Sequence, residues 1–276
     1  MTLSGRNVFF KAGILLTALC LLVLIAVSIV VFPVYSGMDT EGLRRSAGFI
    51  QQFLSRFLKV NLYAAHMAAA VSVLYGFAAL VLIFYFFEKT QCPEILFVAL
   101  FAGSFSFEVV RLIIPLEQIQ EIPSLYILIS ERILLFGRYF GLFSLFAASV
   151  YAAGLDVQKQ RNIFLTITVV TLIFSLGIPV DAQTWDSSFN LATGYAPLFR
   201  LIEAGTFVIT TVSFFAAAST RGSPGFIYTG FGSALVFAGR NILLAADNWA
   251  GLCGIVFLAL GTWLISTRLH KIYLWL

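Results

Sequence analysis

The chain contains a succession of apolar runs, each about as long as a helix that crosses a lipid bilayer. Such a helix needs about 20 predominantly apolar residues, because the hydrocarbon core is about 30 Å thick and an α-helix rises about 1.5 Å per residue. The runs are Phe9–Tyr35, Leu62–Phe87, Pro93–Leu116, Leu125–Leu155, Asn162–Val180, Pro197–Ser219, Pro224–Ala246 and Ala250–Thr267. We therefore predict an all-α fold, a polytopic transmembrane helical bundle of about eight spans. Only Asp247, Asn248 and Trp249 separate the last two runs; if either did not cross fully, the count would fall to seven or six.

The low content of charge supports a fold that lies within the membrane. Charged residues make up 11% of the chain and hydrophobic residues 60%, with a mean hydropathy of +0.97, whereas soluble domains have about 25% charged residues. No polar stretch reaches the length of about 50 residues that a separate folded domain needs. We expect one membrane-embedded domain over residues 1–276. The net charge of +4 is scattered over loops and helices, which argues against nucleic-acid binding.

The distribution of Lys and Arg predicts the orientation. Cytoplasmic loops of membrane proteins carry an excess of these residues. Placing the N-terminus in the cytoplasm puts the following cations on that side: Arg6, Lys11, Lys89, Lys159, Arg161, Arg221, Arg268 and Lys271. Three of the four outer loops then have no Lys or Arg. Both termini are therefore predicted to be cytoplasmic, and the analogy with bacterial multi-span sensor modules suggests the bacterial inner membrane.

The first outer loop is the exception, because it carries Arg44, Arg45, Arg56 and Lys59. Apolar residues recur in this loop at helical spacing, and polar ones fill much of the other side. This pattern predicts an amphipathic helix over about 41–59 that lies in the membrane interface. The helix either caps the bundle or recognises a lipid or a partner.

Five arginines lie inside the predicted spans, together with three glutamates of similar depth. They are Glu108, Arg111, Glu131, Arg132, Arg138, Arg200, Glu203 and Arg240. Such groups are expensive in hydrocarbon and usually face the bundle interior or a wet cavity. Counting residues from the span ends puts most of them in the outer third of the membrane. We predict that the charges of four spans meet in one polar layer.

Spacing supports a common face for these charges. Glu108 and Arg111 are three residues apart on an outward-running span, and Arg200 and Glu203 are three apart on an inward-running one. Residues three apart share a helix face, and the opposite directions place each arginine one turn outside its glutamate. Span four could pack closely through Gly137, Gly141 and Gly154.

The charge balance of this layer suggests a ligand. Five arginines against three glutamates leave an excess of two positive charges if all are ionised. The guanidinium group matches carboxylate and phosphate, so the predicted ligand-binding residues are Arg111, Arg132, Arg138, Arg200 and Arg240. The predicted supporting carboxylates are Glu108, Glu131, Glu203, Asp181 and Asp247. The alternative is a structural network in which Asp181, Asp247, backbone carbonyls or lipid phosphates satisfy the excess.

The loop between spans five and six is expected to cover the layer. Its aromatic residues, Trp185, Phe189 and Tyr195, form either a lid or an ordinary aromatic belt at the membrane interface.

Other chemistry has little support in the residues. Cys20, Cys92 and Cys253 lie in separate segments and resemble neither a disulfide framework nor a metal site. His66 is interpreted as a hydrogen-bonded packing residue. We predict no metal and no cofactor, the catalytic residues are unknown, and a non-enzymatic protein is favoured.

These observations lead to one leading hypothesis and three alternatives. The leading hypothesis is a sensor or accessory binding subunit that takes an anionic or amphipathic small molecule or lipid and works with a membrane or cytoplasmic partner subunit. The alternatives are a transporter or flippase, a lipid-modifying enzyme with Glu108 or Glu131 as general base, and a purely structural salt-bridge network. The inner halves of the spans look almost wholly apolar, which argues against a hydrophilic transport route.

Overall fold

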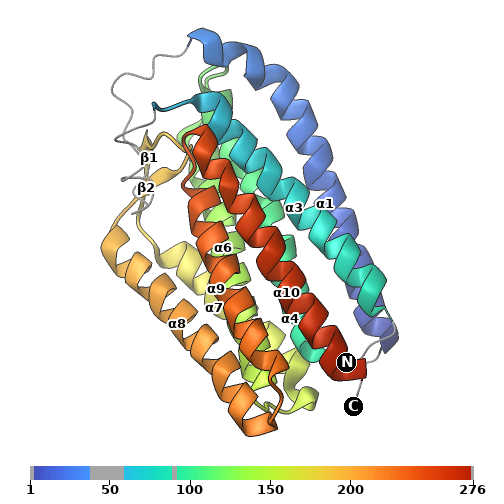
Figure 1. The fold of residues 1–276 in the computed structure, drawn as a ribbon. Helices are drawn as coiled ribbons and strands as arrows, with labels where there is room; N and C mark the ends of the chain where they lie inside the picture. The colour runs from blue at the N-terminus through green and yellow to red at the C-terminus, as the bar shows by residue number, and fades with distance from the viewer. Residues whose placement is uncertain (1–2, 38–58, 89–91, 275–276) are drawn as a thin grey trace.

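The computed structural model describes residues 3–37, 59–88 and 92–274, and these form an all-α bundle (Figure 1). The described residues contain eight helical segments long and apolar enough to cross a membrane, which confirms the predicted fold class. The helices are α1 (Leu3–Val31), α3 (Leu62–Phe87), α4 (Pro93–Ser104), α5 (Ile113–Glu117), α6 (Ser124–Ala152), α7 (Gln160–Gly177), α8 (Ala196–Arg221), α9 (Gly225–Leu244) and α10 (Gly254–Leu274). Short 3-10 helices are η1 (Phe32–Gly37), η2 (Phe105–Leu112), η3 (Val157–Lys159) and η4 (Trp249–Cys253). The protein is an integral membrane protein.

The two ends of the bundle differ. Figure 1 shows the N-terminus and the C-terminus at one end, which we call the termini end. The opposite end, which we call the hairpin end, carries a two-stranded antiparallel sheet of β1 (Val180–Trp185) and β2 (Leu191–Thr193). The predicted interfacial helix falls almost entirely on residues 38–58, outside the part of the chain that the structure describes.

The third span is not one continuous α-helix, contrary to the simplest expectation for an apolar run. It consists of α4, then the eight-residue 3-10 segment η2, then α5. Side chains at i and i+3 eclipse in a 3-10 helix, and runs longer than 3–4 residues are uncommon. In η2 this geometry puts Glu108 directly beside Arg111, and both are buried.

Helices differ in how much of their surface the bundle covers. In the most apolar window of each span, 72% of residues are buried for the third span and 17% for α1 and α8. The exposed faces of the outer helices carry large apolar side chains, for example Leu15, Ile29 and Leu201. Since lipid tails are apolar, these faces suit direct contact with the bilayer.

Two of the three predicted packing glycines of span four perform that role. A Cβ added to Gly137 would come within 2.6 Å of Phe107, and one added to Gly141 would collide with Ser104. The prediction is wrong for Gly154, because a Cβ added there would meet nothing within 4 Å. Gly154 follows the end of α6 with a φ of +117°, so it serves the turn rather than helix packing.

The tightly packed pair of α9 and α10 depends on four glycines that the sequence analysis did not single out. A Cβ at Gly239 would lie 2.6 Å from the carbonyl oxygen of Gly254, and a Cβ at Gly254 would lie 2.7 Å from that of Gly239. Gly232 and Gly261 form a second reciprocal pair, at 3.0 and 2.7 Å. Backbone therefore meets backbone at two levels, seven residues apart on each helix, as in membrane helix pairs with small residues at the interface.

Candidate functional site

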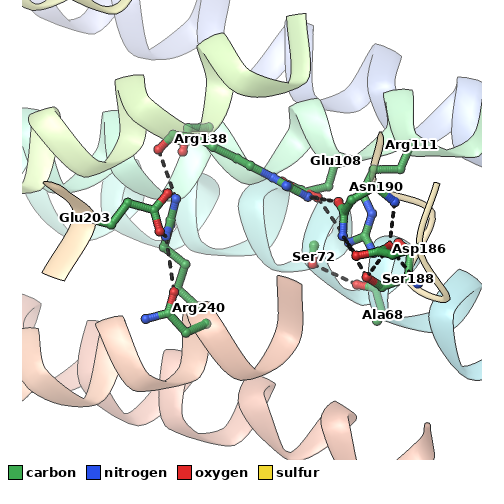
Figure 2. A network of polar contacts seen from close by, with 12 residues as sticks. Ala68, Ser72, Glu108, Arg111, Arg138, Asp186, Ser188, Asn190, Glu203 and Arg240 are labelled. Atoms are coloured by element: carbon green, nitrogen blue, oxygen red, sulfur yellow. Dashed lines mark hydrogen bonds and ion pairs between the residues drawn. The ribbon is translucent and has the colours of Figure 1, made fainter. Parts of the chain in front are cut away.

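The polar layer is centred on Glu108, which accepts bonds from two arginines (Figure 2). The Arg138 side chain binds both carboxylate oxygens, with Nε at 2.7 Å from Oε1 and Nη2 at 2.8 Å from Oε2. Nη1 of Arg111 lies 3.2 Å from Oε2. A carboxylate that a guanidinium grips with two parallel bonds forms one of the stronger ion pairs in proteins. We call Glu108, Arg111 and Arg138 the clasp.

The loop between β1 and β2 closes the clasp from the hairpin end. Arg111 donates from Nη2 to the backbone carbonyl of Ser188, and Arg138 donates from Nη2 to Oδ1 of Asn190 at 2.7 Å. Asp186 shapes this loop, because its Oδ1 accepts from the amide and hydroxyl of Ser188 and from the amide of Asn190 at 2.8–3.0 Å. Asp186 also attracts Arg111 electrostatically. The loop thus supplies both acceptors and negative charge.

Replacing Asp186 by alanine is expected to loosen this loop locally without unfolding the bundle. The change removes the acceptor of three bonds, and a bond of this kind contributes about 0.5–1.5 kcal/mol. Amide hydrogen exchange should become roughly tenfold faster at Ser188 and Asn190. Asp186→Asn keeps the Oδ1 acceptor and is the matched control. Unchanged exchange in Asp186→Ala would show that other contacts hold the loop.

A second ion pair, Arg240 with Glu203, joins the clasp through the backbone of Arg138 (Figure 2). Its geometry is much looser than that of the clasp. Arg240 Nη1 lies 3.6 Å from Glu203 Oε2 and 3.4 Å from Asn241 Oδ1, and Nη2 lies 3.4 Å from the Arg138 carbonyl oxygen. The Arg240 side chain is 4% exposed and that of Glu203 is 22% exposed. A nearly buried cation therefore has only long polar contacts among the described residues.

The other two predicted arginines have different surroundings. Arg132 donates from Nη1 to the carbonyl of Ser175 at 2.7 Å and to that of Ile178. Those carbonyls lie at the C-terminal end of α7, where the helix supplies no backbone N–H groups to bond with them. Arg132 thus caps a helix. Arg200 is exposed on α8.

The predicted supporting carboxylates have different surroundings. Glu131 is buried, and its strongest attraction is to Arg138. Asp247 is buried at the start of the link to α10, where Ser187 Oγ donates to Oδ2 at 2.8 Å and Asn248 Nδ2 donates to Oδ1 at 2.9 Å. Asp181 lies in β1 and is exposed. The pKa of Asp181 lies below its usual range, because the Gln183 amide and the Thr184 hydroxyl donate to its carboxylate.

The three aromatic residues of the candidate lid do not act as a unit. Phe189 is 1% exposed and stacks on Tyr35 with ring centres 5.9 Å apart. Trp185 is half-buried, with its ring centre 6.3 Å from that of Phe189. Tyr195 is exposed at the start of α8. Phe189 thus packs the loop against η1, while Tyr195 faces away from the protein.

His66 is a hydrogen-bonded packing residue, as predicted. Its Nε2 lies 2.8 Å from Ser28 Oγ and its Nδ1 lies 2.9 Å from Tyr35 Oη. Within the described ranges, no group of three or more His, Cys, Asp and Glu side chains is placed to hold a metal ion.

The sequence analysis missed two parts of the polar interior. The first is the set of loop acceptors, Asp186, Ser188 and Asn190. These polar residues cluster in the short segment between β1 and β2, and that clustering was the sequence feature that could have indicated them. The second is Glu94, fully buried near the termini end. Its carboxylate accepts from the Tyr273 hydroxyl at 2.7 and 2.8 Å and lies 3.7 Å from Arg221 Nη1. The half of the bundle at the termini end is therefore less uniformly apolar than the run of residues suggests.

Comparisons of the chain with protein-family models, curated protein sequences and solved structures gave no match.

Proposed function

We propose that this protein is a membrane-embedded binding protein that takes the anionic head of an amphipathic molecule at Arg240, between α8 and α9. The observation that carries the proposal is the bonding of Arg240, whose three polar contacts within the described part of the chain are all 3.4 Å or longer. Leaving a buried charge without good hydrogen bonds is costly. A carboxylate or phosphate could supply the short bonds that Arg240 lacks.

The neighbouring residues suit such a guest. Glu203 is the more exposed partner of the pair, so an incoming anion can replace it as the counter-ion of Arg240. Arg200, three residues earlier on α8, shares a helix face with Glu203 and offers a second cation. Because α8 is mostly exposed, a ligand that reaches this pair from the bilayer would keep its hydrocarbon part in lipid.

The test measures binding of a long-chain alkyl phosphate to the full chain in a neutral detergent, with the corresponding alcohol as the uncharged comparison. The phosphate should bind and the alcohol should not. Arg240→Gln should weaken binding at least about tenfold, because hydrogen bonds to charged groups contribute about 1.5–3 kcal/mol. Glu203→Gln should strengthen binding, since it removes the competing carboxylate.

Arg132→Gln is the matched control, because that arginine already bonds to backbone carbonyls, and it should leave binding unchanged. Equal binding of phosphate and alcohol, or undiminished binding by Arg240→Gln, would contradict the proposal. The opposite signs expected for Arg240→Gln and Glu203→Gln separate a binding role from a general loss of folding.

We propose a structural role for the other half of the layer. The short bidentate grip of Arg138 on Glu108 and the cover of the 186–190 loop favour a clasp that fixes α6, η2 and the hairpin. With the clasp rigid, Arg240 is presented at a defined depth. A sensor or accessory subunit of this kind would act through a partner protein, with both termini in the cytoplasm, as the cations Arg6, Arg221 and Arg268 near the termini end suggest.

A further inference from the structure

A separate cationic pocket lies at the termini end, where α8 ends, α9 begins and α10 approaches its own end. Its volume is about 660 Å³, within the range of about 300–1,000 Å³ that is usual for small-molecule sites. Three cations, Arg221, Arg268 and Lys271, line it together with Phe226 and Ile272, and its described lining has no acidic residue. This pocket is distinct from the Arg240 pair in residues and in its place at the opposite end of α8 and α9.

The guanidinium groups are held in place by the fold. Arg221 donates from Nη2 to the carbonyl of Tyr151 at 2.8 Å, and its Cζ lies 5.5 Å from the ring centre of Phe226. The Cζ of Arg268 lies 4.2 Å above the ring of Tyr228. A guanidinium stacked on an aromatic face keeps its N–H edge directed outward, where it can bond to an anion. Among the described residues, neither Arg268 nor Lys271 is in a salt bridge.

Glu94 holds two residues beside the pocket, the lining residue Arg221 and Tyr273. Its buried carboxylate lies 3.7 Å from Arg221 Nη1 and accepts from the Tyr273 hydroxyl, next in sequence to the pocket residue Ile272. Arg221 therefore has both a structural and a lining role. In the described part of the chain, Glu94 is the one carboxylate in a salt bridge with any of these three cations, which leaves a net positive charge at the pocket.

The position of the pocket along the helices identifies the type of anion. Arg221 is the last residue of α8, and Arg268 and Lys271 lie in the last two turns of α10. Tyr228, in the first turn of α9, and Trp263, five residues before Arg268 on α10, are exposed aromatic residues near this level. Such residues gather where hydrocarbon meets head groups. The pocket combines the apolar walls Phe226 and Ile272 with cations at that boundary. Basic pockets between helices at the cytoplasmic side are suited to anionic lipid head groups.

We propose that this pocket binds the phosphate head group of an anionic membrane lipid, with Arg268 and Lys271 as the principal cations and Arg221 as a positioned third. The acyl chains would lie along the apolar outer faces of α8 and α10. The lipid would tie together the ends of α8, α9 and α10, which meet at this pocket.

The test is native mass spectrometry of the full chain released from detergent with phosphatidylglycerol or phosphatidylcholine added. The wild-type protein should retain phosphatidylglycerol in preference. The double variant Arg268→Gln with Lys271→Gln should lower the apparent affinity for phosphatidylglycerol roughly thirtyfold, or about fivefold for each cation removed near an anionic lipid surface. The double variant Lys159→Gln with Arg161→Gln, which removes two exposed cations of the other helices at the same end, is the matched control and should retain it.

Equal retention of the two lipids, or full retention by the Arg268→Gln and Lys271→Gln variant, would overturn the proposal. Competition by millimolar inorganic phosphate as effective as that of the lipid would assign the pocket to a soluble anion instead, which also overturns it. The variants keep Arg221 and its bond to Tyr151, so folding can be checked independently by thermal unfolding. Arg240→Gln should leave phosphatidylglycerol retention unchanged, so this proposal and the one for Arg240 are tested independently.

Discussion

Replacing Glu108 by glutamine should destabilise the protein more than any other single change in the polar layer. Glutamine has nearly the same shape but no charge, so Arg111 and Arg138 would lose the carboxylate that they share. Removing one partner from a buried pair costs about 3–5 kcal/mol, because it leaves an uncompensated charge. We expect the thermal midpoint of unfolding in detergent to fall by roughly 10 °C, measured by loss of the monodisperse species on heating.

Glu203→Gln is the control for this prediction, since Glu203 is partly exposed and 3.6 Å from its arginine. This pair is long and one partner is partly exposed, so losing it should lower the midpoint much less than losing the bidentate clasp. A similar, small effect of both variants would show that the clasp is dispensable for folding. A large effect of Glu108→Gln alone would confirm that the buried, bidentate geometry is what stabilises the bundle.

Replacing Gly239 by leucine should separate or misfold the α9–α10 pair. The first atom of any side chain at this position would lie 2.6 Å from the Gly254 carbonyl oxygen and from the Leu258 nitrogen. Backbone atoms cannot move aside as a flexible side chain can, so the helices would have to shift apart. Overpacking of this kind costs about 3 kcal/mol or more. Expression, monodispersity and the thermal midpoint should all fall sharply.

The matched control is Gly205→Leu, because Gly205 lies on the peripheral helix α8 with nothing within 4 Å of an added Cβ. It should express and unfold like the wild-type protein. If Gly239→Leu behaved the same way, the close approach of α9 and α10 would not be needed for the native structure. Gly239→Ala is the milder step and should lie between the two.

The spans were predictable because the relevant signals are local. An apolar run of the right length predicts a membrane helix, since its backbone hydrogen bonds are all satisfied within the segment. The short link between the last two spans also depends on local chemistry. The side chain of Asn248 caps the next helical segment by accepting a hydrogen bond from the Gly251 amide. Local chemistry does not report where a helix changes type, and the 3-10 segment η2 was therefore unexpected.

The polar layer was predictable only in outline. Depth along each span correctly grouped Glu108, Arg111, Arg138, Glu203 and Arg240. It could not tell that Arg138 rather than Arg132 grips Glu108, because that depends on how α6 is rotated and how closely it packs on η2. Gly137 and Gly141 allow this close packing, because an added Cβ would collide with Phe107 or Ser104 of the third span. Acceptors such as the Ser188 carbonyl belong to no side-chain pattern and have no sequence signature.

The amino-acid sequence by itself determined that the chain forms about eight membrane helices and that Glu108, Arg138, Glu203 and Arg240 share one layer, because both follow from length, polarity and order along the chain. Only the tertiary structure decided which charges pair tightly, which one keeps long bonds, and where three cations from α8 and α10 form a pocket. These outcomes depend on distances between residues far apart in sequence, as for Arg111 and Ser188, which are 77 positions apart. Such distances are set by helix rotation and backbone packing, and neither is encoded in a local pattern.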